Sequence, residues 1–168
     1  VIINDHFDYG WWGKFGACTE DANGNKIADE TTRAEALKRY ERYWEQISER
    51  FKGYSDHLIF ESANEEFGNH INDYNLGFNT AVNGVTGNLT VAECYTLTNK
   101  LNQDFVDIVR KSGGNNENRH LLLAGYNTNI KSTLDDSYKM PKDTDANGTS
   151  KLSVSVHYYD PWGFCGDD

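Results

Sequence analysis

Two long amphipathic segments alternate with short, continuous apolar runs along this chain, and that alternation restricts the folds open to it. In the first segment, from Thr31 to Gly53, apolar residues recur at steps of three and four: Leu37, Tyr40, Trp44, Ile47 and Phe51. This spacing predicts a helix of about 20 residues with one apolar face. Such a face needs an apolar surface to cover, and a sheet supplies one.

The second amphipathic segment begins with the pattern of a capping box, Thr90-Val91-Ala92-Glu93. In such a box the threonine hydroxyl and the glutamate carboxylate each bond a backbone amide of the other residue. Apolar residues then repeat at helical spacing until Gly113-Gly114: Cys94, Leu97, Leu101, Phe105 and Ile108. We therefore predict a second helix that starts after Thr90 and ends before the two glycines.

Four apolar runs lack a helical period and suit buried strands: residues 1–4, 57–61, 120–125 and 152–156. Residues 9–30, with the turn signal Asn23-Gly24-Asn25, and residues 69–87 have loop composition. Residues 130–150 are mostly irregular, with one helical turn predicted near Ser132–Ser137. Strands that alternate with helices predict a parallel sheet with right-handed crossovers.

Polar groups follow every predicted strand: His6, Asn64 with Glu65, Tyr126 with Asn127, and His157 with Tyr159. The carboxyl ends of parallel strands meet at one rim, which is where barrel enzymes carry their active sites. A flavodoxin-like open sheet has the same element order, but no glycine-rich phosphate loop follows any strand. We predict an α/β fold, a partial (β/α)8 TIM barrel over residues 1–168. In a simpler interpretation, Asn64, Glu65 and Glu66 only cap a loop.

Glu65 and Asn64 together offer a proton donor and an amide that can hold a sugar hydroxyl. Hydrolysis of a glycosidic bond with retention needs a second carboxylate about 5 to 5.5 Å away and a raised pKa on the acid. His6 and His157 are candidates to bind sugar hydroxyls or to orient the carboxylates.

Three tryptophans lie in loops after predicted strands: Trp11, Trp12 and Trp162. Their aromatic faces are candidates for stacking on pyranose rings, and the alternative is ordinary packing against the rim of the barrel. We weigh the two interpretations equally.

The net charge of −10 argues against nucleic acid or an anionic membrane surface as a partner and favours a neutral substrate. No run of 18 apolar residues predicts a membrane span, and no signal peptide is visible. The only metal-like pattern is His6-Phe7-Asp8, so we expect no metal or cofactor. The three cysteines, Cys18, Cys94 and Cys165, allow at most one bridge, which spacing cannot assign.

Three segments together resemble glycoside hydrolase family 5, the cellulase family. They are Val1-Ile2-Ile3-Asn4-Asp5-His6, Ile59-Phe60-Glu61-Ser62-Ala63-Asn64-Glu65 and Ser155-Val156-His157-Tyr158-Tyr159-Asp160-Pro161-Trp162. The resemblance covers essentially the whole chain, which is similar to strands three to six of that family's eight-stranded barrel. It implies a catalytic domain of which the first and last strands are missing.

The resemblance implies a role for five residues. Glu65 matches the acid/base of the family's Asn-Glu-Pro motif, and Asn64 matches the residue that contacts the sugar next to the cleavage point. His157 and Tyr159 match a His-x-Tyr pair that binds substrate and supports the nucleophile. His6 matches the first residue of a His-His pair.

The sequence departs from the family pattern at two positions, because Phe7 replaces the second histidine and Glu66 replaces the proline. The family's nucleophile, a glutamate on strand seven, and its arginine on strand two have no counterpart here. The chain has no initiator methionine, and we expect it to be a fragment that is inactive alone.

By resemblance, the function is that of an endo-β-1,4-glucanase that acts on cellulose or a related β-glucan. The alternative is a non-catalytic, carbohydrate-binding half-barrel, or one that pairs with another copy to cover its open edges. We expect a secreted or cell-surface location because polymeric glucans lie outside cells.

Overall fold

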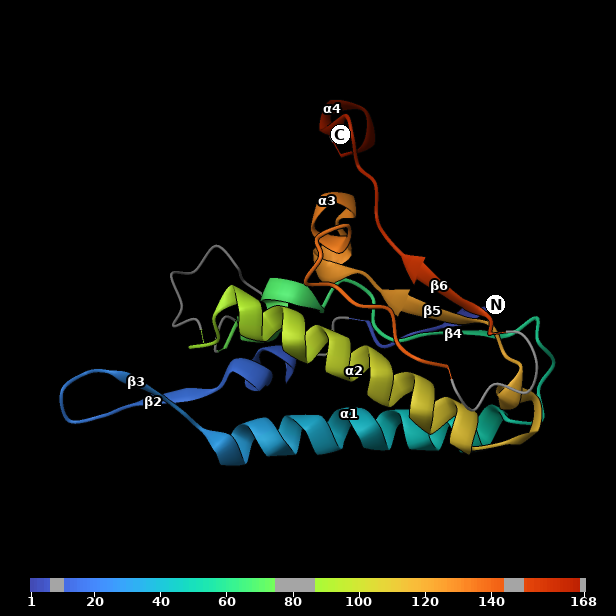
Figure 1. Cartoon of the computed structure of the whole chain (residues 1–168), viewed down its shortest axis with the longest axis horizontal. Coiled ribbons are helices and arrows are strands. Elements are labelled where there is room, and N and C mark those ends of the chain that lie inside the picture. The colour runs from blue at the N-terminus through green and yellow to red at the C-terminus, as the bar shows by residue number, and fades with distance from the viewer. Residues whose placement is uncertain (7–10, 75–86, 144–149, 167–168) are drawn as a thin grey trace.

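Four short strands form a parallel sheet at the centre of the computed structural model, which describes residues 1–6, 11–74, 87–143 and 150–166 (Figure 1). Their order is β1 (Ile2–Ile3), β4 (Ile59–Glu61), β5 (Leu121–Ala124) and β6 (Leu152–Ser155). Each of the four apolar runs holds one of these strands, and every neighbouring pair is parallel. The predicted parallel sheet is confirmed.

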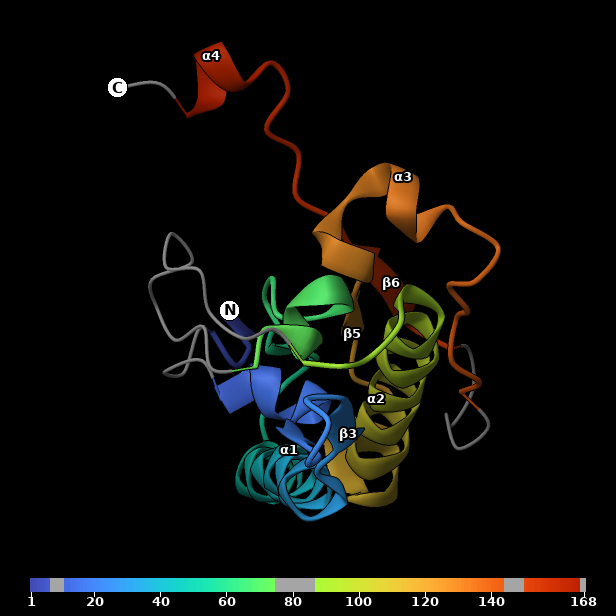
Figure 2. The same cartoon turned by 90° about the vertical axis from the view of Figure 1, so that its left-hand side faces the viewer.

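Two long helices pack side by side against one face of this sheet (Figures 1 and 2). The first, α1, runs over Glu30–Phe51 and begins at Asp29, whose carboxylate accepts from the Thr32 amide at 3.1 Å. The second, α2, runs over Val91–Lys111, and the predicted capping box of Thr90 and Glu93 is present. Both predicted helices are therefore confirmed within one or two residues of their expected ends.

The apolar stripes of the two helices meet the sheet in an aromatic core. The Trp44 ring of α1 lies 4.5 Å from Phe105 of α2 and 5.8 Å from Phe60 of β4, measured between ring centroids. All three side chains are buried, together with Leu121 and Leu123 of β5. Burial of one such side chain stabilises a fold by roughly 1.5–3 kcal/mol. The helices therefore fix the position of the strands from outside.

A buried polar bridge ties the carboxyl ends of β4 and β5 to α2. The Ser62 hydroxyl donates to Asn102 Oδ1 at 2.7 Å and accepts from the Ala124 amide at 2.9 Å. Asn102 Nδ2 donates in turn to the Ala124 carbonyl at 3.0 Å. Every polar atom in this bridge has a hydrogen-bond partner. The bridge can therefore be buried without leaving a polar atom unsatisfied.

The amino-terminal end of the sheet is held by Arg119, which precedes β5 and is 0% exposed. Its guanidinium lies 4.7 Å from the Phe60 ring centroid and donates to the Asn116 side chain. It also donates to four backbone carbonyls of the chain before β4, those of Phe51, Tyr54, Ser55 and Leu58. Arg110 of α2 donates to the Arg119 carbonyl and to Asp143. Two arginines thus join α1, α2 and the starts of two strands.

Short elements occupy the segments predicted as loops. Residues 9–30 contain a 3-10 turn, η1 (Trp11–Gly16), and an antiparallel hairpin of β2 (Cys18–Glu20) and β3 (Lys26–Ala28), which the sequence did not predict. The predicted Asn23-Gly24-Asn25 turn joins these two strands, with Gly24 at φ +79°. The hairpin extends beyond the start of α1 (Figure 1).

The remaining short elements are the 3-10 turns η2 (Gly68–Asn72), η3 (Gly114–Glu117) and η4 (Tyr126–Thr128) and the helical turns α3 (Ile130–Thr133) and α4 (Trp162–Cys165). The helical turn predicted near Ser132–Ser137 therefore begins and ends earlier. Parts of the predicted loops, residues 7–10, 75–86 and 144–149, lie outside the described residues.

No disulfide bond joins Cys18, Cys94 and Cys165, all of which lie in described ranges. Across those ranges, no helix has the length and apolar character needed to cross a bilayer. In the same part of the chain, no group of three or more His, Cys, Asp or Glu side chains is arranged to hold a metal ion.

Candidate active site

The carboxyl ends of β4 and β6 bring together three of the residues singled out from the sequence. Glu65 follows β4, whereas His157 and Tyr159 follow β6, more than 90 positions later. Glu65 Oε1 lies 2.5 Å from His157 Nδ1 and accepts from the Tyr159 hydroxyl at 3.2 Å. The Glu65 side chain is 45% exposed and that of His157 27% exposed, so the group is open to a ligand from solvent.

The pKa of Glu65 reflects a competition between burial and its new partners. Partial burial raises the pKa, but the hydrogen bond and charge of His157, the Tyr159 hydroxyl and the charge of His70 together lower it below the ordinary value. A general acid needs a raised pKa. A neighbouring carboxylate would raise the pKa of Glu65, since like charges raise a carboxyl pKa.

Hydrogen bonds of Asn64 and Asn4 connect the ends of β1 and β4. The Asn64 amide donates to the Asp5 carbonyl at 3.1 Å, and Asn4 Nδ2 donates to Glu61 Oε2 at 2.8 Å. His6 is exposed at the end of this segment. Phe7 and Asp8, which entered the sequence argument beside His6, lie outside the described residues.

The structure contradicts the expectation that Trp11 and Trp12 stack on sugars. Each side chain is only 3% exposed, and the two rings stack on each other with centroids 4.3 Å apart. The turn η1 folds inward, so that Trp12 meets Tyr40 of α1 and Phe67 of the loop after β4 edge-on. Both tryptophans are core residues, which was the alternative interpretation. No face remains for a pyranose ring.

Trp162 differs from the other two tryptophans because its side chain is 60% exposed. It begins α4, and its ring centroid lies 6.0 Å from that of Tyr159, which hydrogen-bonds Glu65. Its aromatic face is therefore available beside the Glu65 group.

Two further polar residues near Glu65 were not predicted from the sequence. His70 in η2 lies 2.7 Å from Asp73, through Nδ1 and Oδ2. The hydrogen bond to Asp73 raises the His70 pKa despite the opposing effect of burial, and the charges of Asp73, Glu65 and Glu66 raise it further. Its position five residues after Glu65 in a polar loop was the only sequence signal. His70 adds positive charge beside the Glu65 carboxylate when protonated.

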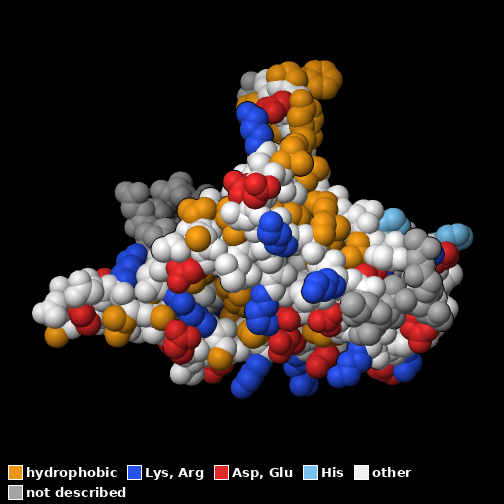
Figure 3. All heavy atoms as spheres, viewed as in Figure 1, with side chains coloured by type: hydrophobic (Ala, Val, Ile, Leu, Met, Phe, Trp, Pro, Cys, Tyr) orange, Lys and Arg blue, Asp and Glu red, His pale blue; other side chains and the backbone are white. Residues whose placement is uncertain are grey.

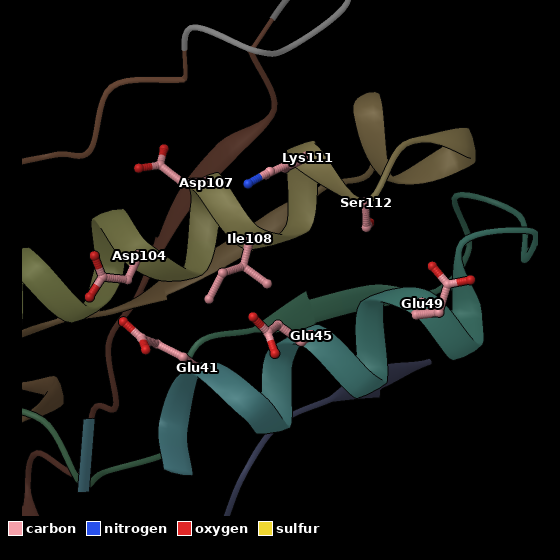
Figure 4. Close-up of a pocket in the computed structure, with 8 residues that line it drawn as sticks. All are labelled: Glu41, Glu45, Glu49, Asp104, Asp107, Ile108, Lys111 and Ser112. Carbon is pink, nitrogen blue, oxygen red and sulfur yellow. The ribbon is translucent and has the colours of Figure 1, made fainter. Parts of the chain in front are cut away.

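A separate hollow of about 480 Å³ lies between α1 and α2, away from the strand ends (Figure 4). Its lining includes acidic side chains of both helices: Glu41, Glu45 and Glu49 of α1, and Asp104 and Asp107 of α2. Ile108 at its floor belongs to the apolar stripe of α2. This hollow contains none of the residues predicted for the site, and it accounts for part of the net negative charge.

The sequence model of the cellulases, glycosyl hydrolase family 5, matches residues 1–168. The chain belongs to glycosyl hydrolase family 5. Endoglucanase A of Paenibacillus barcinonensis is 35% identical over 176 aligned residues, which cover 100% of this chain and 38% of that protein. A xyloglucan-specific endo-β-1,4-glucanase of Bacteroides ovatus is 34% identical over 98% of this chain and 26% of its own length.

Solved structures of family 5 enzymes have the same fold over nearly all of this chain. A lichenase from Caldicellulosiruptor sp. F32, solved with cellotetraose, has a TM-score of 0.67 at 31% identity and covers 97% of this chain and 38% of its own. A xyloglucanase from Paenibacillus pabuli has a TM-score of 0.64 at 35% identity, with 99% and 42% covered. The predicted fold class, a partial α/β barrel, is confirmed. The chain spans 26% to 42% of these family 5 relatives.

Proposed function

We propose that residues 1–168 form part of a retaining glycoside hydrolase that cleaves β-1,4-linked glucan, with Glu65 as the acid/base. The observation that carries this proposal is the contact of Glu65 with His157 and Tyr159 at the carboxyl ends of β4 and β6 in a family 5 chain. Endoglucanases, a xyloglucanase and a lichenase among the relatives support β-glucan as the substrate class.

Glu65 performs two proton transfers in this proposal. It first donates its proton to the glycosidic oxygen while the C1–O bond breaks and a carboxylate nucleophile bonds to C1. It then takes a proton from water, whose oxygen attacks C1 and displaces the nucleophile. The nucleophile belongs to polypeptide beyond these 168 residues, and its negative charge would raise the pKa of Glu65 before the first step.

The other candidate residues bind and orient in this proposal. Asn64 holds a hydroxyl of the sugar next to the cleaved bond, and His6 binds a second part of the substrate. His157 and Tyr159 keep the Glu65 carboxylate oriented by hydrogen bonds. Trp162 offers an exposed aromatic face for a pyranose ring. We propose a secreted or cell-surface location because polymeric glucans lie outside cells.

The test pairs an intact mass of the purified polypeptide with its hydrolysis of carboxymethylcellulose. We expect a mass above 19.1 kDa in an active sample, and loss of activity by a factor of about 10² to 10⁴ in Glu65→Gln, because general acid catalysis is removed. Glu45→Gln is the matched control, an exposed glutamate of α1 that should retain full activity. An active Glu65→Gln enzyme would refute the role of Glu65.

The alternative, a self-associating half-barrel, is favoured by the apolar surface beside β6. Figure 3 shows apolar side chains gathered between the body of the molecule and the projecting α4. Leu134, Met140 and Val156 are exposed and line a hollow of about 440 Å³ beside β6. Exposed apolar patches and open edges favour association. A dimer of 19.1 kDa chains without glucanase activity in size-exclusion chromatography with light scattering would support this alternative.

A further inference from the structure

The turn that follows β5 has an unusual backbone at two adjoining residues. Asn127 has φ +52° and Thr128 has φ +47°, both in the left-handed region. Asparagine is enriched there, but threonine, with its branched Cβ, is an outlier. Thr128 is also buried, so solvent does not relieve the conformation. Strained backbone of this kind persists only where the surrounding contacts hold it, and it clusters at functional sites.

One side of this turn holds the loop that carries Glu65. The Asn127 amide donates to the Phe67 carbonyl at 3.2 Å, and Asn127 Oδ1 accepts from the Asn69 amide at 2.7 Å. These partners lie two and four residues after Glu65 in the sequence. Gly68, between them, approaches so closely that a Cβ there would lie 2.2 Å from Asn127 Oδ1. The turns η2 and η4 are therefore in contact. In Figure 2, η2 is the green ribbon and η4 is the orange turn beside it.

The other side of the turn holds the segment that carries His157. The His157 amide donates to the Thr128 carbonyl at 2.8 Å. This hydrogen bond continues the pairing of β5 with β6, in which the Gly125 amide donates to the Ser155 carbonyl at 3.0 Å. Adjoining residues of one turn therefore bind the two segments that meet in the Glu65–His157 contact of 2.5 Å.

We propose that Asn127 and Thr128 are positioning residues that set the separation between the Glu65 carboxylate and the His157 ring. The left-handed backbone directs the Asn127 side chain toward one segment and the Thr128 carbonyl toward the other. Both residues act through the backbone of the segments that carry Glu65 and His157, not through the Glu65 carboxylate or the His157 ring. That this separation matters for catalysis rests on the proposed function. That the two residues set the separation does not depend on it.

Asn127→Gly tests the proposal in the complete polypeptide that contains these residues. Glycine adopts the left-handed backbone readily, so the substitution removes the Oδ1 acceptor and leaves the turn. The readout is the pKa of the Glu65 carboxyl, measured by carbon-13 NMR titration. We expect it to be higher in the variant than in wild type, because His157, whose hydrogen bond and charge lower the Glu65 pKa, is held less closely. The same variant should lose about tenfold in kcat with little change in KM, since a positioning contact is lost.

Asn72→Gly is the matched control at the other end of η2. Asn72 Oδ1 accepts from the Leu89 amide at 3.0 Å, which is the same kind of bond, but Leu89 precedes α2 and not β6. A general loss of order in η2 would move the Glu65 pKa in both variants. Equal shifts in both, or no shift in Asn127→Gly, would overturn the proposal.

Tyr126→Phe provides a second test if Asn127→Gly fails to fold. It removes the hydroxyl that donates to Asn69 Oδ1 at 2.6 Å and keeps the ring stacked on Tyr95. We expect a smaller rise of the Glu65 pKa in the same direction, and an unchanged pKa would count against the positioning role. A wild-type enzyme that hydrolyses no glucan would refute the proposed function alone, because the Glu65 titration would still decide this inference.

Discussion

The two ends of the parallel sheet use polar side chains in opposite ways. At the amino-terminal end, Arg119 is fully buried, and its donors are engaged by backbone carbonyls and by Asn116. At the carboxyl end, Glu65 and His157 bond each other but keep exposed surface. A side chain whose partners all belong to the protein can only stabilise it, whereas one that remains open to solvent can also meet a substrate. Burial and completeness of hydrogen bonding therefore distinguish structural polar groups from the polar groups proposed for the site in one small sheet.

Arg119→Met should produce the largest effect on the structural side of this comparison. Methionine fills part of the space but removes the guanidinium donors from four backbone carbonyls and from the Asn116 side chain, so we expect the free energy of unfolding to fall by about 3 kcal/mol or more. Urea denaturation measures the change. Lys52→Met is the control, since the Lys52 side chain is partly exposed and pairs with Glu49 of α1, and it should cost less than about 0.5 kcal/mol. A stable Arg119→Met protein would remove the contrast between the two ends.

Two tyrosines with the same exposure, 49%, sharpen the comparison from the other side. Tyr159 donates to Glu65 at the carboxyl end, whereas Tyr54 packs its ring on Phe51 at the amino-terminal end. We expect Tyr159→Phe to lower kcat by about tenfold, through loss of one hydrogen bond to a charged group, without changing stability. Tyr54→Phe should change neither quantity. Equal activity of the two variants on a glucan substrate would show that the Tyr159 bond has no functional role.

Thr90→Ala tests whether a polar contact on the carboxyl side of the sheet can be lost without a change in the Glu65 pKa. Thr90 caps α2 on that side, where its hydroxyl accepts from the Glu93 amide at 3.2 Å. Loss of this cap should lower the free energy of unfolding by about 1 kcal/mol, because one amide of the first turn loses its partner. The Glu65 pKa, followed by NMR, should stay where it is. Thr90→Ser, which retains the hydroxyl, should recover most of the stability.

The smallest expected effect is the contribution of Glu65 to the pH dependence of stability. Its pKa is lowered in the folded chain, so the ionised carboxylate stabilises the fold above the unfolded value of 4.5, and this stabilisation is lost as pH falls through the folded pKa. The side chain is partly exposed, and solvent screening limits the contribution to less than about 1 kcal/mol. Unfolding of wild type and Glu65→Gln at pH 6 and at progressively lower pH should show a difference that shrinks below pH 4.5. A difference independent of pH would contradict the lowered pKa.

The framework of the fold followed from local patterns in the sequence. The stripes of α1 and α2 and the Thr90 cap mark long elements whose period is unambiguous, and the apolar runs between them fit only parallel strands. The hairpin of β2 and β3 was missed because each strand has three residues, mostly exposed, and carries no apolar alternation. Its turn, Asn23-Gly24-Asn25, was recognisable because Gly24 supplies the left-handed backbone.

The candidate site was predicted where it depends on strand ends and was missed where it depends on the path of a loop. Glu65 and His157 follow strands, so the parallel order predicted that both lie at the same rim of the sheet. Trp11 and Trp12 were candidates for both sugar stacking and ordinary packing because composition cannot tell whether a loop folds inward or outward. Thr128 gave no signal, since its left-handed backbone is imposed by contacts with segments far away in the sequence. Tertiary contacts of this kind determine details of the structure that apolar periodicity and helix caps cannot predict.

The carbonyl cluster around Arg119 also has a consequence for the order in which the chain folds during synthesis. The four carbonyls that it binds lie 61 to 68 positions earlier in the chain. The ribosome therefore releases all of α1 and β4 well before the residue that joins them to the rest of the fold. Until Arg119 emerges, these four carbonyls lack its guanidinium as a donor, so the segment from Phe51 to Leu58 completes its hydrogen bonds only when the last third of these 168 residues has begun to emerge.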